Sequence, residues 1–451
     1  MKKLIALLLA LVMVLGLVAC GGSSAPAATE APKADAPAAE APAAAAPAAD
    51  GSVYWLNFKP ESDEALQKIA ALYTEKTGVP VKVVTAASGT YDQTLTAQMD
   101  KSDAPTIFVI GNQAALDNWA DYALDLTGTP IANELATDAY NMYTADGKLG
   151  AIGYCYECFG IITNLELLEK AGYAADYITN FETLKEVAED VHARAAELGF
   201  DAFSSAGMDS ASSWRFTGHL INLEYFYESQ DNPDAWTQCP SELTGAYMDN
   251  FKNLYDLMVV NSATPRADLV NGGFDAAAEF NSGKALFYAN GNWEWSGLQA
   301  AGMDASKLTM LPYYCGVEGE ENVAVNCGTG NYWVINGEAD QADIDATMDF
   351  LVWLVTDPEA SRMAVDTFAV MPFKSAAAST NPFLAIANAQ LAEGKTNMWW
   401  ATNYQPNVDA YRATVVSAMN AYNADPSDAN WETVVAAFID GWATQYAAVN
   451  G

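Results

Sequence analysis

The chain has 451 residues, with 57 Asp and Glu against 21 Lys and Arg and a formal net charge of −36 at pH 7. A chain this acidic is a poor partner for nucleic acid or for an anionic membrane surface. Single hydrophobic cores stop growing near ~250 to 300 residues, so we expect a body with at least two lobes.

The N-terminus has the features of a lipoprotein export signal. Lys2 and Lys3 precede an unbroken apolar run over residues 4–19, and Cys20 follows directly. The run is shorter than the ~20 residues that a membrane-spanning helix needs, and a small residue before Cys matches the lipobox of bacterial lipoproteins. We expect the signal peptide to be removed and Cys20 to carry the lipid. The segment after it is rich in Ala and Pro, which is typical of an extended tether.

Three strand-like runs open the body, at residues 53–58, 81–85 and 106–110. Between the first two, apolar residues recur at helical spacing from a capping Ser62 to a terminating Gly78. This alternation predicts right-handed crossovers and a parallel sheet with helices on both faces. Ligands bind at the carboxyl ends of such strands. The candidates at those ends are Asn57, Tyr91 and Asn112.

The rest of the chain has fewer strands and more helices. An extended stretch ends at Thr163, and Asn164 then caps a helix that Gly172 closes. Further strands are expected at 285–289, which leads into an Asn-Gly turn, and at 332–336. Further helices are expected near 181–198, 241–260, 344–355, 382–393, 409–423 and 428–449, with a break at 356–359 that starts another helix.

Five cysteines remain beside Cys20, an odd number that cannot all pair within one molecule. Cys155 and Cys158 have the spacing of a redox motif. They lie in an aromatic extended stretch, however, and not at the helix start that lowers a thiol pKa, so we do not expect redox chemistry there. Cys315 and Cys327 flank a polar, glycine-bearing segment that can close as a hairpin, and they are the best candidates for a disulfide.

Most enzyme signatures are missing from the sequence. His192 and His219 are the only histidines, and neither a paired Cys-x-x-Cys zinc pattern nor a Gly-x-Ser-x-Gly elbow occurs. Lys284 follows a Gly but lacks the other residues of a phosphate loop, so ATP hydrolysis is not expected. A glycoside hydrolase needs only two well-placed carboxylates, and counting does not exclude one, although no pair is distinguished. We expect a protein that is not an enzyme and that has no cofactor and no metal.

Aromatic residues beside Asn, Asp, Glu and Gly are the enriched feature, with 12 Trp and 22 Tyr in the chain. Sugars bind to this mixture, because their C–H faces lie on flat rings while their hydroxyls hydrogen-bond to amides and carboxylates. We expect Trp353, inside the apolar stripe of its helix, to be a core residue and Trp431 and Trp442 to pack between helices. Trp55 lies near the end of a buried strand and suits either role. Trp293 follows a strand and a Gly-Asn turn, and it is the strongest candidate for a ligand contact.

Three stretches resemble the extracellular solute-binding proteins of carbohydrate importers, the superfamily that includes maltose-binding protein. Residues 284–295, KALFYANGNWEW, resemble that family's strand ending in an Asn-Gly-x-Trp turn whose Trp stacks on sugar. Residues 156–164, YECFGIITN, resemble its first crossing between lobes, where an aromatic or acidic residue lines the cleft. Residues 339–374, with LVTDPE and MPF, are similar to its helix pair and return strand. Two cysteines in the first crossing, and Gly-Asn-Gln at 111–113, depart from the family's pattern.

The resemblance implies an α/β fold of two lobes, like that of periplasmic binding proteins, with hinge crossings and a ligand cleft between the lobes. The implied division is 1–19 signal peptide, 20–51 lipidated Cys and linker, 52–157 and 328–370 lobe one, and 158–327 and 371–451 lobe two. With the strand ends and aromatic residues, it gives these expected ligand-binding residues: Trp55, Asn57, Tyr91, Asn112, Tyr156, Glu157, Asn292, Trp293, Glu294, Tyr332 and Trp399.

The implied function is that of a substrate-binding lipoprotein of an ABC importer. Such a protein captures a sugar or oligosaccharide by hinge closure and delivers it to permease subunits driven by a separate ATPase. We expect a monomer, held only by its lipid on the extracellular face of the cell membrane or in the periplasm, with no nucleic-acid partner. A polyamine or other cationic ligand is the main alternative, since carboxylates and rings also suit ammonium groups. A glycan-cleaving lipoprotein is the second.

Overall fold

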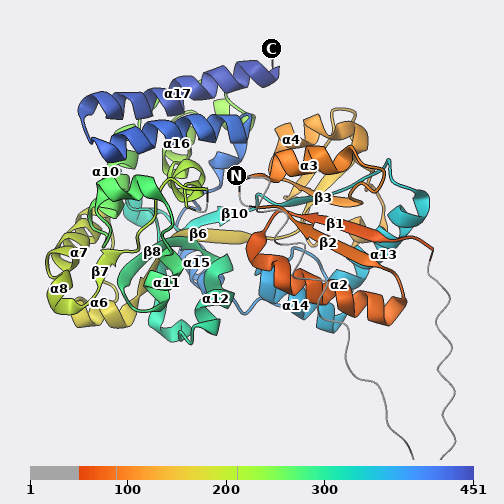
Figure 1. The fold of residues 1–451 in the computed structure, drawn as a ribbon, viewed down its shortest axis with the longest axis horizontal. Helices are drawn as coiled ribbons and strands as arrows, with labels where there is room; N and C mark the ends of the chain where they lie inside the picture. Colours follow the sequence, from red (N-terminus) through yellow and green to blue (C-terminus); the bar gives the residue numbers. More distant parts are fainter. Residues whose placement is uncertain (1–49, 88, 211, 451) are drawn as a thin grey trace, which may run out of the picture. The chain divides into compact units, whose positions relative to one another are not determined.

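The computed structural model describes residues 50–87, 89–210 and 212–450, and the expected signal peptide and Cys20 lie outside them. Within the described residues the chain forms two β-sheets, each with its own helices (Figure 1). Among these residues, one buried cluster packs on the first sheet and two pack on the second. No helix in this part of the chain is long and apolar enough to cross a membrane.

The first sheet has six strands in the order β2-β1-β3-β11-β5-β4. β1 pairs in parallel with β2 and β3, as predicted, but β11 runs antiparallel to both β3 and β5. The expected parallel sheet therefore holds for the first three strands only, because the chain enters β11 on its way back from the second sheet. The strands are β1 (Val53–Asn57), β2 (Val81–Thr85), β3 (Ile107–Ile110), β4 (Asn141–Tyr143), β5 (Leu149–Gly153) and β11 (Tyr332–Ile335).

Helices on the first sheet cover a core of large aromatic side chains. The ring centroids of Tyr154 and Trp333 are 4.7 Å apart, and the Trp55 ring lies 5.6 Å from Trp333 and 6.2 Å from Tyr154. The first of these helices, α2, ends at Gly78 with a left-handed φ of 80°, as the sequence predicts. The helices are α2 (Asp63–Thr77), α3 (Tyr91–Met99), α4 (Gln113–Asn118), α5 (Pro130–Asn133), α13 (Gln341–Thr356) and α14 (Pro358–Phe368).

The second sheet has the order β10-β6-β8-β7, with β9 paired to β6. Its strands are β6 (Glu157–Asn164), β7 (Asp201–Phe203), β8 (Ala285–Gly291), β9 (Leu308–Leu311) and β10 (Asn326–Gly328). Its helices are α6 (Leu165–Ala171), α7 (Phe181–Ala193), α8 (Ala195–Leu198), α9 (Asn222–Asp231), α10 (Met248–Val260), α11 (Ala276–Asn281), α12 (Trp295–Ala300), α15 (Pro382–Ala392), α16 (Val408–Ala424), α17 (Asp428–Asn450), the π-helix η3 (Arg215–Leu220) and the 3-10 helices η6 (Asn292–Glu294) and η9 (Ala401–Tyr404).

Local signals place several of these elements. The Asn164 side chain accepts hydrogen bonds from the N–H groups of Glu166 and Leu167, and Gly172 ends α6 at a φ of 100°, as predicted. Trp431 and Trp442 are buried in the cluster around α16 and α17, also as predicted.

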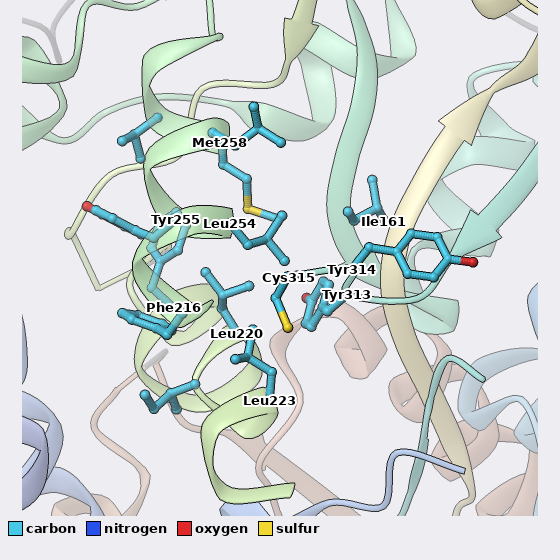
Figure 2. Packing of buried hydrophobic residues seen from close by; sticks show 14 of the residues in the cluster. Ile161, Phe216, Leu220, Leu223, Leu254, Tyr255, Met258, Tyr313, Tyr314 and Cys315 are labelled. Carbon is cyan, nitrogen blue, oxygen red and sulfur yellow. The ribbon is translucent and has the colours of Figure 1, made fainter. Parts of the chain in front are cut away.

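The cysteines differ from the expectation. Cys315 lies in the main cluster of the second sheet, where Figure 2 shows it beside Tyr313 and the side chains of η3, α9 and α10. Cys327 belongs to a different cluster, and all five cysteines of the described residues are free thiols. The predicted disulfide between Cys315 and Cys327 is therefore not observed, because the segment between them forms a 3-10 turn and not a simple hairpin.

The chain passes between the two sheets three times. The first crossing joins β5 to β6, the second joins β10 to β11, and the third follows α14. Met371 and Phe373 still belong to the buried cluster of the first sheet, although the predicted boundary at 370/371 put them in lobe two. We therefore propose that the third crossing lies after these residues, while the other boundaries stay as predicted.

Strain is concentrated at the start of this last segment. Ala369 has φ 66° and ψ −58°, and the N–H of Val370 donates to the carbonyl of Phe368 at 2.9 Å. These are the features of a classic γ-turn, which is rare because the conformation is strained for a residue with a Cβ.

We expect Ala369→Gly to stabilise the protein. The γ-turn costs a non-glycine residue roughly 1 to 3 kcal/mol, whereas glycine adds only about 0.5 to 1 kcal/mol of unfolded-chain entropy. Denaturant unfolding should thus show a gain of about 1 kcal/mol. Ala71→Gly, at an exposed position inside α2, is the control and should lose stability. A loss at both positions would show that Ala369 is not strained.

A second prediction concerns Glu224, which is fully buried on α9 four residues before Glu228. Burial, followed by the neighbouring Glu228, raises the pKa of Glu224 to about 9. The folded state therefore holds a proton that the unfolded state releases near its ordinary pKa of ~4.3. This contribution to stability is complete below that pH and is lost as the pH rises toward 9.

Glu224→Gln keeps the shape and cannot ionise. Relative to this variant, the unsubstituted protein should lose up to about 1.4 kcal/mol of unfolding free energy per pH unit between roughly pH 5 and 9. Denaturant unfolding at several pH values measures this slope. The exposed Glu169→Gln on α6 removes the same charge without burial and should leave the slope unchanged. Equal slopes for Glu224→Gln and the unsubstituted protein would show that Glu224 is ionised when folded.

Candidate functional site

A buried ion pair lies where the first sheet meets the first crossing. Asn57, at the end of β1, holds the following turn: its Nδ2 donates to the carbonyl of Lys59 at 2.7 Å, and the Lys59 N–H donates to its Oδ1 at 3.1 Å. The turn places Lys59 Nζ 3.0 Å from Glu157 Oε1 and 3.3 Å from Glu61 Oε1. Burial by itself would lower the pKa of Lys59, but these carboxylates raise it, so the ammonium stays charged.

Glu157 connects three parts of the chain. It is the first residue of β6, is 1% exposed, and accepts a hydrogen bond from Asn331 Nδ2 at 3.2 Å. Asn331 belongs to the second crossing, and Lys59 lies in the turn that follows β1 of the first sheet. A single carboxylate at the start of β6 thus contacts both the turn after β1 and the second crossing.

Trp293 lies on η6 directly after β8, and its ring is partly exposed. Lys59 Nζ is 5.5 Å from the ring centroid, a cation–π distance. The ring packs across Gly291, where an added Cβ would come within 2.2 Å of it. Only glycine at this position lets the indole lie flat against the end of the strand.

Further aromatic rings surround Trp293. Trp214 and His219 have ring centroids 6.1 and 5.3 Å from it. His219 stacks on Phe159 at 4.1 Å with an interplanar angle of 4°, and Trp400 lies 5.2 Å from Phe159. Burial, with the charges of Arg412, Arg215 and Lys59, lowers the pKa of His219 well below its ordinary value, so the imidazole is neutral.

A second charged group lies against the Trp214 ring. The guanidinium of Arg215 is 4.3 Å from the Trp214 ring centroid, and its Nη2 donates to the Tyr288 hydroxyl at 3.3 Å. Burial raises the pKa of Glu294, and the nearby guanidinium of Arg215 acts against that rise. The residues joined by these contacts will be called the crossing cluster: Lys59, Glu157, Trp214, Arg215, His219, Trp293, Glu294 and Trp400.

Several polar atoms of the crossing cluster are buried without a hydrogen-bond partner among the described residues. They are Glu157 Oε1, His219 Nδ1 and Trp400 Nε1, together with Oδ1 of the adjacent Asn331. Glu157 Oε1 is compensated by its ion pair with Lys59. A buried donor or acceptor that stays unpaired costs about 1 to 3 kcal/mol, so a polar ligand that pairs with these atoms would gain binding energy, although atoms of this kind also occur elsewhere in the described residues.

Three of the predicted ligand-binding residues lie in the crossing cluster: Glu157, Trp293 and Glu294. The others have different surroundings. Trp55 and Tyr332 are both buried in the cluster of the first sheet. Tyr156 precedes β6, and its ring lies 5.7 Å from that of Tyr140, outside the contacts that join the crossing cluster.

The remaining predicted residues make structural contacts. Asn57 organises the Lys59 turn, the Tyr91 hydroxyl accepts from the N–H of Val109 at 2.7 Å, and Asn112 caps α4. Asn292 Oδ1 accepts from the N–H of Cys158 at 2.6 Å. Trp399 packs on Trp236 and Tyr404. We leave these residues out of the proposed site.

Sequence reasoning missed five members of the crossing cluster: Lys59, Trp214, Arg215, His219 and Trp400. Lys59 directly follows a strand end that the sequence does mark as a candidate region, and Trp400 is the neighbour of the predicted Trp399. The other three lie around a π-helix, for which the sequence gives no periodic signal.

This fold, with two lobes joined by chain crossings, is that of the two-lobed binding proteins. The family model of bacterial extracellular solute-binding proteins matches residues 68–393, and the chain belongs to that family. No curated protein sequence matches the chain.

Solved structures with the same two-lobed fold are similar to nearly the whole chain. A complex titled RafE with raffinose has a TM-score of 0.68 at 14% identity and covers 89% of this chain and 100% of its own. A sugar transporter protein from Bacillus licheniformis, solved with stachyose, has 0.63 at 13% and covers 87% and 100%. A substrate-binding protein from Listeria monocytogenes, solved with cycloalternan, has 0.62 at 14% and covers 89% and 98%. At these identities the likeness shows the fold.

Proposed function

We propose that this chain is the substrate-binding lipoprotein of an ABC importer, and that it captures a neutral sugar or oligosaccharide between its lobes and delivers it to the permease. The observation that carries the proposal is the crossing cluster, where the partly exposed rings of Trp214 and Trp293 lie among charged and unpaired polar groups. Rings accept the C–H faces of a sugar, and the polar groups bind its hydroxyls. The neighbours solved with raffinose, stachyose and cycloalternan support this ligand class.

The charges in the cluster favour a sugar over a polyamine. Glu157 is already paired with Lys59, and Glu294 lies beside Arg215. A polycation would have to displace these internal cations from their carboxylates, and the remaining positive charges would repel it. A neutral ligand only needs hydrogen bonds and can leave the Lys59–Glu157 ion pair and the Arg215–Glu294 attraction in place.

A thermal-shift screen tests the ligand class. A ligand that binds only the folded state stabilises it by about 2.7 kcal/mol at a hundred times its Kd. We expect raffinose-type or other neutral oligosaccharides to raise the melting temperature and spermidine and amino acids to leave it unchanged. Recovery of the ligand unchanged by chromatography separates binding from glycan cleavage. A shift with spermidine alone would establish the cationic alternative, and a shortened oligosaccharide would establish the glycosidase.

Hinge closure is the proposed mechanism, because three chain segments join the two sheets and Glu157, on β6 of the second sheet, pairs with Lys59 in the turn after β1 of the first. A ligand that contacts both lobes shifts the population toward a closed state, which offers the permease and its separate ATPase a surface that the empty protein lacks. Small-angle scattering with the confirmed ligand should show a smaller radius of gyration. An unchanged radius would remove the hinge mechanism and keep the binding function.

We propose that Cys20 carries the lipid anchor. The protein is then held as a monomer on the extracellular face of the membrane or in the periplasm. Cys20→Ser removes the only residue of the lipobox that can be acylated. We expect this variant to appear in the soluble fraction or to remain unprocessed, whereas Cys239→Ser stays with the membrane. Membrane fractionation decides, and a Cys20→Ser protein that is processed yet tightly membrane-bound would show another anchor.

A further inference from the structure

Two cysteines lie opposite each other where the first two crossings enter the second sheet. β6 and β10 run side by side and antiparallel (Figure 1), and their register pairs Cys158 directly with Cys327. Opposite Cα atoms in an antiparallel pair are about 4.5 to 5.5 Å apart. A disulfide spans Cα separations of about 4.4 to 6.8 Å, so this pair needs no movement of the backbone to be bridged.

Neighbouring side chains fix both backbone positions. Asn292 Oδ1 accepts from the N–H of Cys158 at 2.6 Å. Asn397 accepts from the N–H of Cys327 and donates to its carbonyl, both at 3.0 Å. Both thiols are buried, at 0% and 1% exposed, in one apolar cluster. The sheet register and the groups on either side therefore hold the two cysteine backbones opposite each other.

We propose that Cys158 and Cys327 form a disulfide when the chain folds outside the cell. The family is extracellular, and disulfides persist in that oxidising environment. The remaining thiols have separate surroundings: Cys155 lies in the first core, Cys315 lies in the second core, and Cys239 donates to the carbonyl of Tyr404. One intramolecular bond and three free thiols account for the odd number of cysteines left beside Cys20.

The bond can form by thiol–disulfide exchange with a small-molecule disulfide such as oxidised glutathione. The exchange takes place while the chain folds, before burial encloses the two thiols. Once the strands pair, the Cys158 thiol, followed by the Tyr156 hydroxyl, lowers the pKa of Cys327 against the effect of burial, so Cys327 is the attacking thiolate. It attacks one sulfur of the oxidant and releases one small thiolate. Cys158 then gives up its proton, attacks the Cys327 sulfur and expels the second small thiol. Two protein thiols are oxidised, one disulfide is reduced, and the two protons end on the released thiols.

The bond closes a long segment of chain that contains most of the second sheet. A disulfide that closes a long loop removes more entropy from the unfolded chain than one that closes a short loop. The disulfide itself is little strained where the native backbone already has the geometry that the bond needs. The disulfide also joins β6, which begins at Glu157, to β10, which ends shortly before Asn331. It therefore fixes the spacing of the two strands near the hydrogen bond between Asn331 and Glu157. This inference does not depend on which ligand the protein binds.

The test uses purified protein, reduced and unfolded, then refolded in a buffer of reduced and oxidised glutathione. Free thiols are alkylated under denaturing conditions, and the peptides are mapped by mass spectrometry. We expect one disulfide-linked pair of peptides containing Cys158 and Cys327, and full alkylation of Cys155, Cys239 and Cys315. The oxidised protein should melt about 5 °C above the reduced protein.

Two variants give the matched comparison. Cys158→Ser should abolish the difference in melting temperature between oxidised and reduced protein and leave Cys327 open to alkylation. Cys239→Ser should keep both the bond and the difference. If Cys158→Ser does not fold, peptide mapping of the unsubstituted protein still decides the question.

Three results would overturn the proposal. One is alkylation of both Cys158 and Cys327 after oxidative refolding, and another is a bond from Cys327 to Cys315. The third is copper(I) binding without a disulfide, since Met310 Sδ lies 4.0 Å from Cys158 Sγ and soft sulfur ligands suit that ion.

Discussion

Trp293→Ala should weaken ligand binding by about 30- to 1,000-fold, because truncation removes an aromatic surface worth roughly 2 to 4 kcal/mol to a stacked sugar. The ring is partly exposed, follows β8 on η6 and lies within 5.5 Å of Lys59 and 5.3 Å of His219. Calorimetric titration with the oligosaccharide identified by the thermal screen measures the loss. A melting curve of the empty variant shows whether the fold is intact.

Trp353 provides a matched control. It is a partly buried tryptophan with Lys76 Nζ 5.7 Å from its ring centroid, so it resembles Trp293 in burial and in its cation contact. It packs on Tyr73 and Phe350 in the first core, outside the crossing cluster. Trp353→Ala should lower the melting temperature and leave affinity unchanged. Unchanged affinity in Trp293→Ala would remove the stacking role, and a collapse of its melting temperature would make Trp293 a packing residue.

Local signals in the sequence predicted most elements of the fold. Asn164 and Gly172 bracket α6 because a cap and a left-handed glycine act within one turn of helix. The direction of β11 could not be predicted in this way. It pairs with β3 and β5, which are distant in sequence, and its antiparallel direction follows from the path of the chain through the second sheet.

The candidate site was harder to predict than the fold, since adjacent residues with the same chemistry have different surroundings. Trp399 packs on Trp236, while Trp400 lies against Phe159, and no periodic pattern distinguishes the two. Asn57 was a reasonable candidate at a strand end, but its amide holds the turn that positions Lys59. The pairing of Cys327 with Cys158 likewise depends on strand register, which neighbouring residues do not reveal.

The largest expected effect on stability comes from Lys59→Met. Methionine fills a similar volume but leaves Glu157, which is 1% exposed, without its cation. Removing one partner of a buried pair typically costs about 3 to 5 kcal/mol, because the other charge stays in the interior uncompensated. Denaturant unfolding of the empty protein should show this loss as a lower midpoint with an unchanged slope.

Removing both charges distinguishes the ion pair from simple packing. Lys59→Met combined with Glu157→Gln leaves no buried charge, and glutamine can still hydrogen-bond to Asn331, so the double variant should recover most of the loss. Lys68→Met breaks the exposed pair of Lys68 and Glu64, at 2.7 Å on α2, and should hardly move the midpoint, because water screens that pair. If the double variant is no more stable than Lys59→Met, the cost lies in the packing of the Lys59 side chain and not in an unpaired Glu157.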